Sequence, residues 1–286
     1  MSAYTVSLKG KRDQNEDFHD VVLNLNKKNK DKEHVNFYAV YDGHGGTFVS
    51  KFLHNIMPNI FTVKREKSIY PIRAKTIEKI YVNLQNILKV KYTKNASQAG
   101  STCLIALHNK QGDNDYLTVI NTGDSRCIIC RSDAGVNHAR EITKDHKPHS
   151  FEELHRIKKL GGRPVFDGYD WRINDLSVSR AFGDIDANYV TNIPDIYKLK
   201  LLMKNNKNTP HDKFFILACD GLWDVMSSQE VVNFILERCY IITKSENGHI
   251  IDKRIKTDKD IAKELGKYAL QKGSSDNVTI IVVFLD

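Results

Sequence analysis

The chain alternates short apolar runs, typical of β-strands, with longer stretches whose apolar residues recur every three or four positions, as in amphipathic helices. Strands are predicted over residues 4–9, 18–25, 37–42, 101–108, 116–121, 126–131, 171–178, 214–219 and 278–285. Helices are predicted over residues 48–61, 77–88, 150–160, 227–236 and 258–271. Pro58 should kink or end the first helix, and a polar insertion occupies residues 243–257.

The order of these elements predicts the fold class. Several strands follow one another as a meander, and the helices fall into two pairs that are far apart in the sequence. Each sheet face and each helix stripe must be buried against another element. The pattern therefore predicts an α+β sandwich of four layers, α-β-β-α, with two stacked antiparallel sheets flanked by antiparallel helix pairs. We see no linker, so residues 1–286 are expected to form one domain without a separate regulatory domain.

Two of the predicted strands end in the same unusual way. The run 37–41 leads into Asp42-Gly43, and the run 214–219 leads into Asp220-Gly221. A buried carboxylate must be paired, hydrogen-bonded or bound to a metal. Neither aspartate has a Lys or Arg within two residues. The repetition therefore suggests that a metal cation is the missing partner.

Composition and charge narrow the functional classes only a little. The chain has 286 residues, 41% hydrophobic and 27% charged, with a formal net charge of +8, so nucleic acid, a membrane surface or a phosphorylated partner was considered. No basic run is interleaved with aromatic residues, as single-strand binding would need, and the lysines are scattered through predicted loops. The charge is therefore assigned to a solvated surface, and neither nucleic acid nor a membrane is expected as a partner.

The cysteines and the beginning of the sequence bear on compartment. Five cysteines without disulfide-framework spacing indicate a reducing environment. The first residues contain no secretory apolar region, and no apolar run approaches membrane-spanning length. A cytoplasmic location is expected, with the nucleus as a second compartment. A monomer is the default because no exposed apolar seam is evident.

Further acids lie at predicted strand ends or beside glycine and come from distant parts of the chain: Glu16, Asp17, Asp42, Asp124, Asp220, Asp224 and Asp276. Mg²⁺ and Mn²⁺ prefer oxygen ligands, and two ions about 3.5–4 Å apart can clamp an in-line displacement. Taken singly, each acid is better explained as a cap, a turn or a surface charge. Beside such a site, His44 becomes a candidate general acid and Arg12 a candidate phosphate ligand.

A series of motifs occurs in one order along the chain: Gly10-Lys11-Arg12, Glu16-Asp17, Asp42-Gly43-His44-Gly45-Gly46, Gly100-Ser101-Thr102, Gly123-Asp124-Ser125-Arg126, Asp145-His146-Lys147-Pro148, Ser177-Val178-Ser179-Arg180-Ala181-Phe182-Gly183-Asp184, Asp220-Gly221-Leu222-Trp223-Asp224 and Ser275-Asp276-Asn277. The set resembles the metal-dependent serine/threonine protein phosphatases of type 2C. The resemblance extends from about Thr5 to Phe284. It implies the same four-layer sandwich, and it implies hydrolysis of phosphoserine and phosphothreonine in proteins by direct attack of a water that bridges two Mn²⁺ or Mg²⁺ ions.

The resemblance also implies roles for single residues. Asp42 would bridge both ions, Glu16 and the Gly43 carbonyl would serve one, and Asp220 and Asp276 the other. Asp124 and Asp224 would contribute to a third, weaker position. Asp17 would orient the attacking water, Arg12 would hold the substrate phosphate, and His44 would protonate the leaving oxygen. Arg180 and the flap region 163–175 would touch the protein substrate.

Two positions depart from the family pattern, and two other functions remain open. Cys127 and Asp175 stand where the family usually has glycine, so strand and flap geometry are in question there. One alternative is a catalytically weak or silent phosphatase-like binding module, which should have lost metal ligands. The other is a metal-dependent nuclease or phosphodiesterase, which should show steep salt dependence but has no groove-reading element here.

Overall fold

A computed structural model describes residues 1–27, 34–62, 72–204, 209–244, 250–255 and 260–285. Its first large sheet has the strand order β1 (Ser2–Leu8), β17 (Val278–Phe284), β14 (His211–Ala218), β8 (Arg126–Asp133) and β9 (Val136–Glu141). Its second has the order β13 (Asp195–Lys200), β7 (Asn114–Thr122), β6 (Cys103–Gln111), β3 (Val35–Tyr41) and β2 (Phe18–Val22). Neighbouring strands in both sheets are antiparallel.

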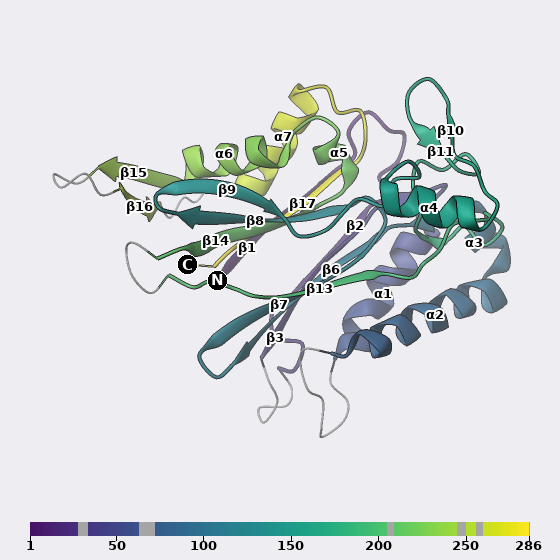
Figure 1. Ribbon diagram of the computed structural model, residues 1–286, viewed down its shortest axis with the longest axis horizontal. Coiled ribbons are helices and arrows are strands. Elements are labelled where there is room, and N and C mark those ends of the chain that lie inside the picture. The colour runs from purple at the N-terminus through teal and green to yellow at the C-terminus, as the bar shows by residue number, and fades with distance from the viewer. Residues whose placement is uncertain (28–33, 63–71, 205–208, 245–249, 256–259, 286) are drawn as a thin grey trace.

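Helices cover the outer face of each sheet (Figure 1). On the first sheet lie α6 (Ser228–Cys239) and α7 (Ile261–Gln271), with the short α5 (Asp220–Trp223) at one end. On the second lie α1 (Phe48–Phe61), α2 (Ala74–Lys91) and the short α3 (Thr93–Gln98). The four layers therefore follow the predicted order α-β-β-α.

Alternation of side chains along the buried strands explains how three apolar layers fill this sandwich. On β14, Phe214 and Ile216 face α6 and α7, whereas Phe215 and Leu217 face the second sheet. Because both faces of the central strands are covered, β3 and β17 are apolar or aromatic at every position but one. Every residue of β3 and of β17 is buried.

Smaller elements project beside one end of the sandwich. Helix α4 (Phe151–Lys159) precedes a hairpin of β10 (Val165–Phe166) and β11 (Trp171–Arg172), and these lie together in Figure 1. A three-stranded ribbon joins β12 (Phe182–Gly183), β5 (Gly100–Ser101) and β4 (Gly43–His44). A further hairpin, β15 (Tyr240–Lys244) with β16 (Ile250–Arg254), lies far from that end.

The structure corrects several sequence predictions. Helix α1 continues past Pro58 to Phe61, because a proline three residues before the end removes only one helical hydrogen bond. The predicted strand 171–178 is strand only at Trp171–Arg172. The insertion 243–257 contributes to β15 and β16, while its residues 245–249 and 256–257 lie outside the described residues. The first residues predicted for the 258–271 helix also lie outside them, and α7 is described from Ile261.

Among the described residues there is no helix that combines the length and the apolar character needed to cross a membrane.

Candidate metal centre and active site

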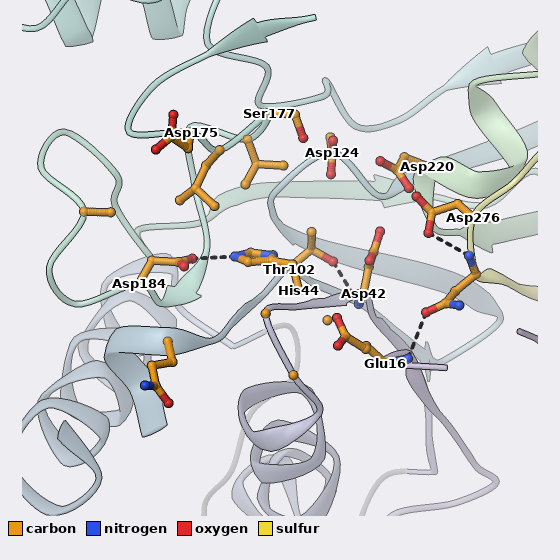
Figure 2. Close-up of a pocket in the computed structure, with 18 of the residues that line it drawn as sticks. Glu16, Asp42, His44, Thr102, Asp124, Asp175, Ser177, Asp184, Asp220 and Asp276 are labelled. Atoms are coloured by element: carbon orange, nitrogen blue, oxygen red, sulfur yellow. Dashed lines mark hydrogen bonds and ion pairs between the residues drawn. The ribbon is translucent and has the colours of Figure 1, made fainter. Parts of the chain in front are cut away.

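One end of the sandwich gathers acidic residues around a cleft of about 970 Å³. The acids follow or precede strands whose ends meet there: Asp42 follows β3, Asp220 follows β14, Asp276 precedes β17, Asp124 precedes β8 and Glu16 precedes β2. In antiparallel sheets, alternate strand ends lie at the same edge, which explains how residues distant in sequence converge. Figure 2 shows these five side chains around the cleft.

Three of these carboxylates approach one another closely. One oxygen each from Asp42, Asp124 and Asp220 lies within 4.8 Å of the other two. Burial raises the pKa of Asp42 and of Asp220 well above the ordinary value, and repulsion from the neighbouring carboxylates adds to the effect. Burial and mutual repulsion disfavour the ionised form of these carboxylates. A bound cation would stabilise that form.

Asp17 forms a second close group with Asp42 and Cys219, whose ligand atoms lie within 4.8 Å of one another, and it supports the same conclusion. It is 6% exposed, and neither carboxylate oxygen has a hydrogen-bond partner among the described residues. Burial raises its pKa to about 6. The nearby Cys219 thiol accepts a hydrogen bond from the backbone N–H of Thr279 and reaches the carbonyl of Asn277, so it is already engaged. The remaining candidate metal ligands are carboxylate oxygens, which suit a hard divalent cation such as Mg²⁺ or Mn²⁺.

Backbone contacts fix the loop that carries Asp42 and Gly43. The backbone N–H of Asp42 donates to Thr102 Oγ1 at 3.1 Å, and the Thr102 N–H donates back to the Asp42 carbonyl at 2.9 Å. A side chain at position 43 would collide with the carbonyl of Glu16 and with Ser50 Oγ. Glycine therefore lets the Glu16 backbone and the β3–β4 turn lie against each other at the cleft.

The loop that carries Arg12 and Glu16 is held from the other end of the sequence. Asn277 Oδ1 accepts from the Glu16 N–H at 2.8 Å, and Asn277 Nδ2 donates to the Lys9 and Gln14 carbonyls at 2.8 and 3.0 Å. Arg12 Nη2 donates to Asp276 Oδ2 at 2.6 Å. Asn277 lies within the Ser275-Asp276-Asn277 motif, but the motif alone does not predict this bridging role.

Lys147 is a second residue whose role sequence reasoning missed. Its ammonium lies 2.5 Å from Asp124 Oδ2, 3.9 Å from Asp170 Oδ2 and 4.0 Å from Asp220 Oδ2. Its side chain is only 18% exposed. The carboxylates around it raise the pKa of Lys147 above its ordinary value, against the effect of burial. The cluster therefore carries a tethered cation of its own.

His44 lies at the cleft and is paired with Asp184, which sequence reasoning had not selected. His44 Nε2 and Asp184 Oδ2 are 2.8 Å apart (Figure 2). Burial alone would lower the pKa of His44, but the hydrogen bond and charge of Asp184 outweigh it, so the pKa is raised. The imidazole is thereby biased towards its protonated form, which can donate a proton.

Three predicted site residues lie outside the lining of the cleft: Asp17, Arg180 and Asp224. Arg180 is bound between Glu153, at 2.6 Å, and Asp195, at 2.8 Å. Asp224 follows α5 and is close enough to Lys147 and Asp124 for their charges to affect its raised pKa. Residues of the predicted flap do reach the cleft, through Arg172, Asn174 and Asp175.

Comparisons with known proteins define the class. Residues 4–278 match the family model for protein phosphatase 2C. The chain is 33% identical over 303 residues to the mouse integrin-linked kinase-associated serine/threonine phosphatase 2C, covering 99% of this chain and 72% of that protein. It is 33% identical over 287 residues to protein phosphatase 1L of Bos taurus, covering 97% and 70%. Fold, site and matches define a metal-dependent protein serine/threonine phosphatase.

The chain therefore belongs to the protein phosphatase 2C family. A solved serine-threonine phosphatase 2C from Toxoplasma gondii is similar in structure, with a TM-score of 0.73 over 99% of this chain and 94% of that one. Its sequence identity is 23%, so this likeness bears on the fold alone. The family and the α-β-β-α fold predicted from sequence are both confirmed.

Proposed function

We propose that the acidic cleft holds two Mn²⁺ or Mg²⁺ ions and that the chain hydrolyses phosphoserine and phosphothreonine there. Asp42 would be shared, Glu16 and the Gly43 carbonyl would hold one ion, and Asp220 and Asp276 the other. The observation that supports this most directly is the approach of the Asp42, Asp124 and Asp220 oxygens to within 4.8 Å of one another. When bound, the ions would neutralise phosphate charge and make water a stronger nucleophile.

Residues of the chain supply the remaining steps. Arg12 lies at the cleft with a side chain 61% exposed, so its guanidinium can turn from Asp276 towards phosphate oxygens. Asp17 accepts a hydrogen bond from the attacking water with one of its unpaired oxygens. His44 gives its proton to the serine or threonine oxygen as the P–O bond breaks. No phosphorylated enzyme is formed.

Asp124 and Asp224 would hold a third, weaker ion. Its proposed weakness is supported by the Lys147 ammonium, which lies 2.5 Å from Asp124 Oδ2 and would compete with such an ion. A third ion must displace this tethered charge before it can use the same carboxylate. Position 124 therefore has two competing partners, one covalently attached to the chain and one free in solution.

The substrates are phosphorylated proteins, and a nucleic acid or membrane partner is not part of the proposal. All five cysteines are buried and free, which supports a reducing compartment, the cytoplasm or the nucleus. We propose a monomer in which residues 1–286 act as one catalytic domain. A catalytically silent module would be expected to lack ligands, whereas the four acids proposed to hold the two ions, Glu16, Asp42, Asp220 and Asp276, all line the cleft.

The test is phosphate release from a phosphothreonine peptide with Mn²⁺, with Mg²⁺ and with EDTA. Activity should require the metal and should be lost in Asp42→Asn and Asp220→Asn, which keep side-chain size but remove charge. Glu78→Gln, an exposed change on α2, is the matched control. Phosphate release that persists in EDTA, or full activity of Asp42→Asn, would refute the proposal.

A further inference from the structure

His44 and Asp184 meet across a glycine in the small ribbon beside the cleft. His44 on β4 pairs with Gly100 on β5, and Gly100 pairs with Gly183 on β12. Asp184 directly follows Gly183. A side chain at position 100 would collide with Asp184 Oδ2 and His44 Nε2. The three short strands therefore leave a gap at Gly100 that the histidine–carboxylate pair fills.

The backbone before Asp184 is held on its other side by α2. Gln85 Nε2 donates to the Gly183 carbonyl at 2.7 Å, and Gln85 Oε1 accepts from the Gly183 N–H at 3.0 Å. The Asp184 N–H donates to the Ala99 carbonyl at 3.2 Å. One glutamine thus satisfies both backbone groups of the residue next to the carboxylate. This two-point contact fixes where the Asp184 side chain starts.

The backbone conformation at Asp184 is costly. Its φ is +44°, in the left-handed region that residues with a Cβ avoid. Such conformations persist where the surroundings enforce them, and they are concentrated at functional sites. Here the result is a carboxylate whose side chain is 8% exposed and which reaches His44 Nε2 at 2.8 Å. A buried carboxylate in this position is aimed at one ring nitrogen.

We propose that Asp184 is a positioning residue for the phosphatase reaction and that Gln85 holds it in place. Asp184 accepts a hydrogen bond from the Nε2–H of His44 and so fixes the orientation of the imidazole ring. Nδ1 has no hydrogen-bond partner among the described residues and is left to serve the substrate. The Nδ1 proton passes to the leaving oxygen as the P–O bond breaks and the water oxygen binds phosphorus. Both protons of that water leave with the phosphate, and His44 ends neutral with its Nε2–H still hydrogen-bonded to Asp184. This rests on the proposed role of His44 as general acid.

The experiment compares two substrates in Mn²⁺-loaded enzyme. A phosphothreonine peptide has a leaving alkoxide that needs a proton, whereas p-nitrophenyl phosphate has a stable leaving group that does not. Because general acids contribute at least about 100-fold, Asp184→Ala should lower kcat for the peptide by about 100-fold and change kcat for p-nitrophenyl phosphate by less than about threefold. Gln85→Ala should also lower the ratio of kcat for the peptide to kcat for p-nitrophenyl phosphate, by a smaller factor. Asn86→Ala, on an exposed neighbour on α2, is the control.

Two further variants separate the positioning role from its premise. If Asp184 acts through His44, the double variant His44→Ala, Asp184→Ala should be no worse than His44→Ala alone. If His44→Ala affects both substrates equally, the general-acid role itself fails. If His44→Ala is selective but Asp184→Ala and Gln85→Ala are not, the positioning role alone is overturned. Should Asp184→Ala not fold, Asp184→Asn and Gln85→Ala give the same comparison.

Discussion

The side chain of Asn277 accepts a hydrogen bond from the backbone N–H of Glu16, a residue 261 positions earlier, at 2.8 Å. Its amide nitrogen also reaches the Lys9 and Gln14 carbonyls. One side chain thus closes the loop that brings Arg12 and Glu16 to the cleft. The loop between β1 and β2 owes its shape to a residue that precedes β17.

Asn277→Ala should therefore damage both stability and metal binding. Three hydrogen bonds worth about 1 kcal/mol each are lost, so the free energy of unfolding should fall by about 3 kcal/mol. Binding of Mn²⁺ should weaken because Glu16 is no longer held. Urea denaturation and isothermal titration of the metal measure the two effects, with exposed Asn83→Ala as control. Unchanged metal affinity would show that the loop keeps its shape without Asn277.

Lys147→Met should have opposite effects on the two forms of the protein. Without metal, the cluster loses the ammonium that lies among Asp124, Asp170 and Asp220, and loss of a buried partner costs about 3–5 kcal/mol. With metal, the weakest ion should bind more tightly because nothing competes for Asp124. Thermal unfolding with EDTA and Mn²⁺ titration test this, and Lys147→Arg retains the charge as control. Identical titrations of parent and Lys147→Met would contradict competition at Asp124.

Metal should stabilise the protein more as pH rises. In the metal-free protein burial raises the pKa of Asp17 from 3.8 to about 6 and raises those of Asp42 and Asp220 well above the ordinary value. A raised carboxyl pKa contributes stability that is fully present below the ordinary pKa and is lost as pH rises through the folded value. The metal-free cluster should therefore lose stability from pH 5 to pH 7.5, while bound cations offset the loss.

The measurement is the difference in melting temperature between Mn²⁺-loaded and EDTA-treated protein at each pH. Burial lowers the pKa values of His108 and His211, which are remote from the cleft. Their contribution to the pH dependence is the same with and without metal, so it cancels in the difference. The difference should grow across this range. In Asp42→Asn the growth should be smaller, since one of the titrating carboxyls is gone. A difference that stays flat in the parent protein would argue against a cation site built from these acids.

Arg180 offers a test of a role assigned by resemblance. Its guanidinium binds Glu153, whose side chain is 2% exposed, and also Asp195. Arg180→Ala breaks a buried ion pair and should lower the free energy of unfolding by about 3 kcal/mol. The KM for a phosphopeptide should change little. Exposed Arg163→Ala is the control. A raised KM with unchanged stability would instead assign Arg180 to the substrate.

The parts of the fold that could be predicted from sequence are those with a strong local pattern. Strands β3 and β14 each finish with five consecutive apolar or aromatic residues and lead into an Asp-Gly pair, so both the strands and the acids beyond their ends are evident. Edge strands β9 and β13 could not be predicted, because they contain no buried residue and lack a clear apolar alternation. The predicted strand from Trp171 failed where Asn174 and Asp175 adopt positive φ and form a tight turn.

The two departures from the family pattern have simple local explanations. Asp175 has a φ of +64°, so it occupies the left-handed conformation for which glycine is the usual residue. Cys127 is fully buried between the two sheets, where a small apolar side chain fills space. Neither substitution replaces a predicted metal ligand, and Asp175 adds a carboxylate to the lining of the cleft.

The residues that sequence reasoning did not assign act through contacts that no local pattern encodes. Lys147 could be quoted within a motif, but its approach to Asp124 depends on how two loops face each other. Asp184 is 140 positions from His44, and its role appears only when β4, β5 and β12 are paired. A role that follows from the type of a residue can be predicted from the sequence. A role that depends on which distant side chain the residue contacts can be assigned only from the structure.

The place of β17 in the first sheet has a consequence for biosynthesis. This strand lies between β1 and β14, although it follows both in the chain. A nascent polypeptide that ends before Asp276 already contains most of the acids. It lacks the strand that joins β1 to β14 in the first sheet. From this topology we expect the acids of the cleft to be aligned only after β17 has been inserted between β1 and β14.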